Sequence, residues 1–107
     1  MPTSAPRLHS YTVTLTSANQ VYNLGTLISA IDSRYPREPR KEVNLQFDSS
    51  NTAGKILLVG DANLSTTRFG YKLIPGGSRF YPKAVYVPDV NLQSDLAGAT
   101  VNVELVD

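Results

Sequence analysis

Apolar and polar residues alternate along several short stretches of the chain, with the period of two that is typical of half-buried β-strands. Residues 11–16, 42–48 and 99–106 show this alternation most clearly. Threonines fill the outward positions of the first stretch, and β-branched residues of this kind favour strands. The apolar side chains that the three stretches direct inward are Tyr11, Val13, Leu15, Val43, Leu45, Phe47, Val101, Val103 and Leu105.

Shorter stretches between these three also favour strands. Residues 55–60 read KILLVG, a nearly continuous apolar run that indicates a strand covered on both faces. Further short strands are expected at residues 69–74, 78–81, 84–88 and 90–93, because turns rich in Gly, Pro, Asn and Ser separate these stretches.

One segment follows the helical period instead. Asn23 is a good N-cap, and it precedes an apolar stripe with the spacing of one helix face. The stripe consists of Leu24, Leu27, Ile28 and Ile31. A helix of two to three turns that contains Gly25 is stable only when it packs against something else, so it is expected at one end of a sheet.

About eight short strands and one short helix, with no helices between the strands, predict an all-β fold. We expect a jelly-roll-like antiparallel β-sandwich rather than a barrel. The 107 residues fit a single domain over residues 9–107. Residues 1–8 contain two prolines and several small polar residues, and are expected to be a flexible N-terminal arm.

The amino-acid composition and net charge exclude several classes of protein, site and partner. The apolar fraction of 41% and charged fraction of 18% are globular values. The absence of cysteine excludes disulfides and thiolate-bound metals. Apolar runs of a few residues are too short to span a bilayer, and the first residues lack a secretory apolar region. A net charge of +1 gives no reason to expect nucleic acid or an anionic membrane as a partner.

Catalytic chemistry has little support in the sequence. His9 is the only histidine, and it adjoins the expected arm, where a general base would not be held in position. The acidic residues are scattered, with no spacing that favours a carboxylate pair. Asp61, Asn63 and Ser65 resemble the start of a calcium loop, but Lys72 stands where the bidentate Glu is required. We therefore assign no catalytic residue, metal site or cofactor, and leave open only a weak cation or ligand near Asp61.

A basic segment, RYPREPRK, is the main local concentration of charge. Two prolines keep it extended and stiff, so that little conformational entropy would be lost on docking. Arg and Tyr are favoured anchors of protein interfaces. A merely solvated loop is the alternative interpretation. As candidate partner-binding residues we take Arg34, Tyr35, Arg37, Arg40 and Lys41.

The stretch from residue 56 to residue 81 resembles a pattern found in small structural proteins of tailed bacteriophages. In that pattern a strand ending in Val-Gly leads through a polar turn to a Gly-x-x-Leu-x-x-Gly segment and an aromatic strand. The Thr-rich strand, Ser-Ala-Asn turn and Leu-rich helix upstream are similar too, so the resemblance covers residues 11–81. It does not include the basic segment. The matching residues are Val59, Gly60, Asp61, Asn63, Ser65, Gly70, Leu73 and Gly76 or Gly77.

The resemblance implies a non-enzymatic virion component, assembled in the host cytoplasm: a capsid decoration protein, a head-fibre base, or a small tail or adaptor protein. A capsid decoration (cement) protein that binds the shell and neighbouring copies is the leading expectation, with capsid or other virion proteins as partners and a homo-oligomer as its state. The alternative is a carbohydrate- or receptor-binding β-sandwich module of a phage tail or fibre. Its polar and stacking groups would be Asp61, Asn63, Tyr71 and Tyr81, although the absence of Trp disfavours sugar stacking.

Overall fold

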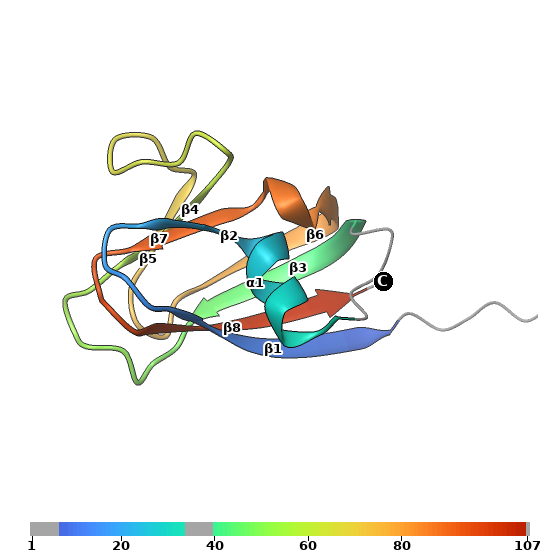
Figure 1. Cartoon of the computed structure of the whole chain (residues 1–107), viewed down its shortest axis with the longest axis horizontal. Helices are drawn as coiled ribbons and strands as arrows, with labels where there is room; N and C mark the ends of the chain where they lie inside the picture. Colours follow the sequence, from blue (N-terminus) through green and yellow to red (C-terminus); the bar gives the residue numbers. More distant parts are fainter. Residues whose placement is uncertain (1–6, 34–39, 107) are drawn as a thin grey trace, which may run out of the picture.

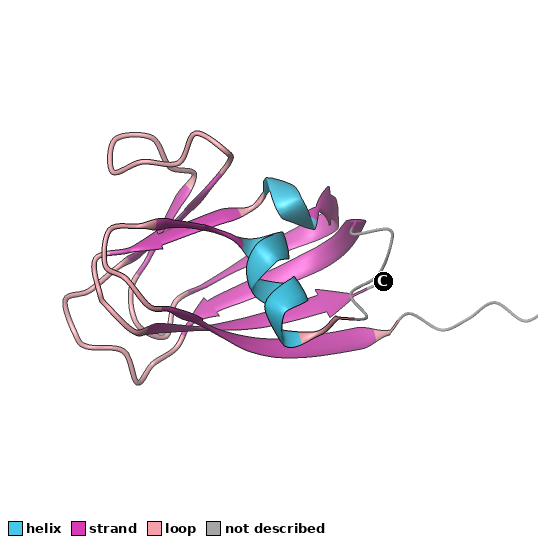
Figure 2. Cartoon of the chain, viewed as in Figure 1, coloured by secondary structure: helices cyan, strands magenta, loops and turns pink. Residues whose placement is uncertain are grey.

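The chain forms a sandwich of two four-stranded antiparallel sheets, one long and one short (Figures 1 and 2). The computed structural model describes residues 7–33 and 40–106. The long sheet has, in spatial order, β1 (Leu8–Leu15), β8 (Ala99–Val106), β3 (Arg40–Phe47) and β6 (Ser78–Tyr86). The short sheet has β2 (Val21–Asn23), β7 (Asn91–Ser94), β4 (Leu57–Gly60) and β5 (Tyr71–Leu73).

The strand order identifies the jelly-roll arrangement. Strand β1 pairs with β8, β2 with β7, β3 with β6 and β4 with β5, all antiparallel. The first half of the chain therefore pairs with the second half in reverse order, and the resulting long double ribbon is folded over to form both layers. The expectation of an all-β, jelly-roll-like sandwich with about eight strands and one helix is confirmed.

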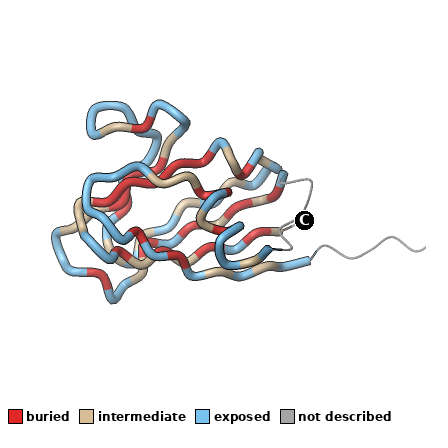
Figure 3. The backbone as a smooth tube through the Cα atoms, in the orientation of Figure 1, coloured by how far each residue is buried: buried red, intermediate tan, exposed pale blue. Residues whose placement is uncertain are grey.

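The core lies between the two sheets and is built from the inward residues of the alternating strands. Figure 3 shows buried and more exposed positions alternating along the long strands, as the period of two requires. Phe47 is the largest fully buried side chain. Residues Leu24 and Ile28 of the helix and Val87 of the connection before β7 belong to the same buried cluster. The core thus extends beyond the short sheet.

The helix α1 (Leu24–Ile31) begins directly after β2, as the N-cap signal predicts. The Asn23 Oδ1 atom accepts a hydrogen bond from the backbone N–H of Thr26 at 3.1 Å. The Asn23 amide also donates to the carbonyl oxygen of Pro88 at 2.6 Å, in the short 3₁₀ helix η1 (Val87–Asp89). A Cβ atom at Gly25 would lie 3.1 Å from Pro88 Cγ. The glycine that weakens the isolated helix therefore allows α1 to pack closely against η1.

Two of the strands differ from those that the sequence predicts. Residues 78–81 and 84–88 were expected to be separate strands, but residues 78–86 form the single strand β6. Pro82 is compatible with this because β6 is an edge strand, where a missing N–H need not break a ladder. The three-residue strand β2 was not expected, because it is too short to show periodicity.

The N-terminal boundary also differs. Leu8, which the sequence places in the arm, pairs with Val106, and His9 is a residue of β1 opposite Leu105. Residues 1–6 of the expected arm lie outside the described residues.

Glycine turns shape the corners of the sandwich as expected. Gly76 has a φ of +87°, and the Gly77 N–H donates to the Ile74 carbonyl at 2.8 Å to close the turn between β5 and β6. A Cβ atom at Gly77 would lie only 2.9 Å from that carbonyl oxygen, so no larger residue fits without a shift. Gly60, at the end of β4, and Gly70, just before β5, do not have a positive φ.

Candidate functional site

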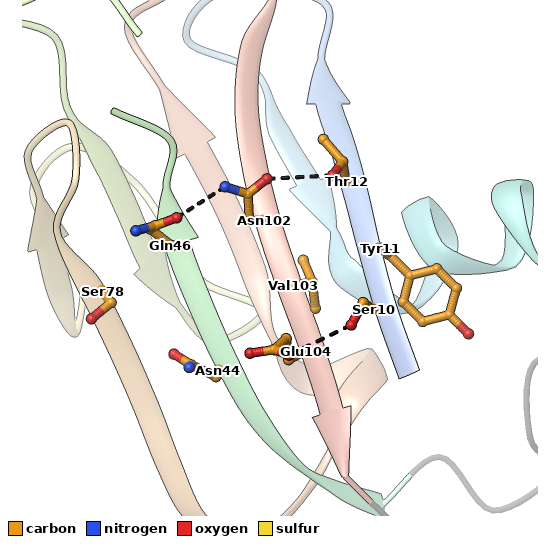
Figure 4. A pocket seen from close by; sticks show the side chains of 9 residues that line it. All are labelled: Ser10, Tyr11, Thr12, Asn44, Gln46, Ser78, Asn102, Val103 and Glu104. Carbon is orange, nitrogen blue, oxygen red and sulfur yellow. Dashed lines mark hydrogen bonds between the residues drawn. The ribbon is translucent and has the colours of Figure 1, made fainter. Parts of the chain in front are cut away.

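The outer surface of the long sheet carries polar side chains, which its strand register arranges in two rows. One row runs from Ser10 on β1 through Glu104 and Asn44 to Phe80 on β6, and the other runs from Thr12 through Asn102 and Gln46 to Ser78. We call this surface the polar face. Its seven polar residues are Ser10, Thr12, Asn44, Gln46, Ser78, Asn102 and Glu104. They line an open concavity with a volume of about 430 Å³ (Figure 4).

Hydrogen bonds across the strands hold part of the polar face in place. Asn102 Nδ2 donates to Gln46 Oε1 at 3.0 Å, and Thr12 Oγ1 donates to Asn102 Oδ1 at 3.3 Å (Figure 4). Asn102 Nδ2 also donates to Asp48 Oδ1 at 2.8 Å. Ser10 and Glu104 make a longer contact of 3.5 Å. The amide of Asn102 is therefore fixed at the centre of three strands.

Asp48 anchors one end of this network. Hydrogen bonds from the Ser50 hydroxyl, then from the Asn102 amide and the Ser50 backbone N–H, lower the pKa of the Asp48 carboxyl below its ordinary value. These donors favour the charged form, because a carboxylate accepts hydrogen bonds that a protonated acid cannot fully use. Asp48 consequently stays ionised beside the polar face at neutral pH.

The loop between β3 and β4 is fixed beside Asp48 by a buried amide. The Asn51 side chain donates to the carbonyls of Asp48 and Thr100, at 2.9 and 2.8 Å. Its Oδ1 atom accepts from the Thr100 N–H at 2.9 Å. The sequence indicates only a turn here, and Asn is common in exposed turns, so the structural role of Asn51 was not predicted.

A second concavity is lined by residues from the end of β4, from β6, from the start of β3 and from η1. It has a volume of about 510 Å³, and its wall includes Arg40, Asp61, Tyr81, Tyr86 and Asp89. This groove brings together one residue of the basic segment and two of the four residues assigned to ligand binding. Asn63 and Tyr71, the other two, do not line it.

Tyr71 and Tyr81 face each other across an arginine. The guanidinium carbon of Arg79 lies 4.0 Å from the ring centroid of Tyr71 and 4.6 Å from that of Tyr81. Both distances are within the range of cation–π interactions. The stack joins the edge strands β5 and β6, so these rings already serve to close one side of the sandwich.

Asp61 and Asn63 form the Asx-type turn that the sequence predicts. Asp61 Oδ1 accepts from the Asn63 N–H at 2.9 Å, and Arg68 forms an ion pair with Asp61 at 3.3 Å. The Asn63 hydrogen bond, followed by the charge of Arg68, lowers the pKa of the Asp61 carboxyl. Both members of the ion pair are well exposed, and such pairs stabilise little. The four predicted ligand residues therefore form two local groups with structural roles.

The basic segment is only partly described. Arg34, Tyr35 and Arg37 lie outside the described residues. Arg40 is exposed at the start of β3. Lys41 is 7% exposed and lies opposite Val85 of β6, so little of its side chain is accessible to a partner.

Within residues 7–33 and 40–106, no three His, Asp or Glu side chains lie close enough together to hold a metal ion. No described helix has the length and apolar character needed to cross a membrane.

Comparison of the chain with protein-family models, with curated protein sequences and with solved structures found no match.

Proposed function

We propose that this protein is a non-enzymatic structural component of a bacteriophage virion, a capsid decoration protein that binds the shell and neighbouring copies of itself. The observation that carries the proposal is the length and composition of strand β1, the end strand of the long sheet. The sequence resemblance supports it, as does the jelly-roll architecture, which viral capsid domains use. The architectural argument is an analogy, since one fold hosts many functions.

Strand β1 is an eight-residue edge strand of the long sheet. An edge strand presents a row of backbone N–H and C=O groups that can pair with another chain. Among the described strands, only β8 pairs with β1. The sequence of β1, LHSYTVTL, contains no proline, lysine or acidic residue that would oppose such pairing.

The other edges are less suited to pairing. Strands β2 and β5 have three residues each, and β6 carries Pro82 and Lys83 near its middle. Short edges, proline and lysine are the features by which sheets avoid edge-to-edge contact. Strand β1 is therefore the edge through which we expect association.

A second copy of the chain is the partner that β1 fits most simply. Two β1 strands related by a two-fold axis would pair antiparallel, as closed dimers require. Threonines such as Thr12 and Thr14 would then meet across the junction, and Thr–Thr pairs are favourable in antiparallel sheets. The strand contains no Lys, Arg, Asp or Glu, so pairing would bring none of these charges together.

Light scattering coupled to size-exclusion chromatography tests the copy-to-copy contact. We expect the molar mass to rise with concentration towards a dimer or larger oligomer. Thr14→Lys should shift the protein towards monomer, because paired edges would bring two lysines close together. Thr100→Lys is the matched control: Thr100 lies directly opposite Thr14, on the same face but in the interior strand β8. A strict monomer, or equal effects of both substitutions, would exclude pairing through β1.

Contact with the shell needs a separate test. Cross-linking and mass spectrometry of purified particles of the encoding phage should join this chain to the major shell protein. Cross-links confined to copies of the chain, or absence of the chain from the particles, would refute the decoration role.

A further inference from the structure

We infer that the polar face is a binding site for a neutral saccharide chain. This inference concerns a surface other than the β1 edge and the four residues that the sequence suggests, and it does not depend on the virion assignment. It rests on the chemical character, the ordering and the shape of the seven polar residues and Phe80.

The charge of the polar face selects the ligand class. Six of the seven polar residues carry hydroxyl or amide groups, and only Glu104 is an acid. No lysine or arginine lines the concavity, so a phosphate or sulfate group would find no counter-charge. A single carboxylate is also a poor site for a hard cation, which takes several oxygen ligands. Uncharged hydroxyl groups remain the best match, because amides and hydroxyls can both donate to them and accept from them.

Some hydrogen-bonding groups are committed and others are free for a ligand. Gln46 Oε1 accepts from Asn102, which leaves the Nε2 hydrogens of Gln46 available. Within residues 7–33 and 40–106, the side chains of Asn44 and Ser78 make no hydrogen bonds with other residues. Ser78 lies opposite Gln46 on β6, and Asn44 precedes Gln46 by two residues on β3. The network thus orients the central amides, while their neighbours retain donors and acceptors. A surface ordered in advance loses less conformational entropy when it binds.

Phe80 adds an apolar surface at the end of one row. It lies on the edge strand β6, directly opposite Asn44, and is 47% exposed. A pyranose ring has an apolar C–H face and a polar rim of hydroxyl groups. Stacking that face on Phe80 would direct the rim towards Asn44 and its neighbours. Small-molecule sites combine aromatic side chains with a few precisely placed polar groups, and Phe80 with Asn44 offers one such combination.

The concavity is open and runs across four strands, which suits a chain of several sugar units rather than one enclosed unit. Each sugar unit would bury little of its surface in such an open site. We therefore expect dissociation constants in the millimolar range, with longer chains binding more tightly.

Two-dimensional ¹H–¹⁵N NMR titration tests the inference. The probes are cellohexaose, xylohexaose, mannohexaose and chitohexaose at millimolar concentration, with inorganic phosphate as the charged comparison. At least one hexasaccharide should shift the resonances of the outward residues of β1, β8, β3 and β6, and phosphate should not. The dispersion of each variant's spectrum reports whether it is folded.

Variants locate the site. Gln46→Ala and Phe80→Ala should each weaken binding about tenfold or more, which corresponds to about 1.4 kcal/mol. Asn63→Ala removes an exposed amide from the turn after β4 and should leave the affinity unchanged. The inference is overturned if no hexasaccharide perturbs the polar face, if the shifts map to residues 61–70, or if folded Phe80→Ala binds as well as the parent chain. None of these results bears on self-association, which chromatography measures separately.

Discussion

Replacing Asn51 by alanine tests whether one buried amide holds the β3–β4 loop onto the long sheet. Its side chain makes three hydrogen bonds of 2.8 to 2.9 Å, two donated to carbonyls and one accepted from the Thr100 N–H. Each such bond contributes about 1 kcal/mol net, and an orphaned buried N–H costs about 1–3 kcal/mol. The carbonyl of Asp48 keeps a bond from the Asn51 N–H, and that of Thr100 keeps one from the Asp48 N–H. The orphaned group is therefore the Thr100 N–H.

These terms predict that Asn51→Ala lowers the free energy of unfolding by about 3 kcal/mol. At about 4 °C per kcal/mol for a domain of this size, the midpoint temperature should fall by roughly 12 °C. Urea unfolding is the direct measurement, with the midpoint concentration decreasing and the slope unchanged. Asn63→Ala, at an exposed turn position, should change stability by less than about 0.5 kcal/mol. A loss at Asn51 no larger than that at Asn63 would refute the reasoning, because water would then replace all three bonds at no cost.

Two further substitutions probe the helix cap and the acid end of the polar network. Asn23→Ala should lower the free energy of unfolding by about 2 kcal/mol, because it removes both the cap on Thr26 and the hydrogen bond to the Pro88 carbonyl. Asn23→Ser should recover about half of this loss, because it restores the cap alone. Urea unfolding of both variants measures the two effects. Asp48→Asn should destabilise the protein at neutral pH, and the difference from the parent chain should shrink as pH falls below 3.8. The pH dependence has this direction because folding lowers the pKa of Asp48. The stability that the ionised carboxylate contributes is present above its pKa in the unfolded chain, and it is lost as pH falls through the lower pKa of the folded chain. A difference in melting temperature that is independent of pH would contradict this account.

The strands and their inward faces could be read from the sequence because one local signal determines both. Alternation places Val43 and Val103 inward, and it necessarily places Asn44 and Asn102 outward. The outward residues of each strand were therefore available from the same pattern. Alternation along a strand, however, does not say which strand is its neighbour. The polar face exists because β8 lies between β1 and β3, a pairing across more than fifty residues of sequence.

The four residues predicted around Asp61 and Tyr71 do not all line one concavity, for a related reason. Polar turn residues and aromatic side chains are typical of binding sites, but they are equally typical of loops and edges. Here Asp61 orders its own turn, and Tyr71 packs on Arg79 of a strand in the other sheet. The sequence neighbourhood of Tyr71 does not reveal that Arg79 would lie between it and Tyr81, since that depends on how the two sheets approach each other.

The two proposed surfaces share strand β1 but use different atoms of it. Edge pairing would use the outward backbone groups of β1, while the polar face uses side chains such as Ser10 and Thr12, which point away from the sheet plane. A two-fold axis perpendicular to the sheet would continue one polar face into the other. The joined surface would cross eight strands, so a long saccharide chain could contact both copies, and binding to one copy would raise the effective concentration at the second. Association through β1 would then strengthen ligand binding without any new contact to the ligand, even though each surface can be removed independently by its own substitution.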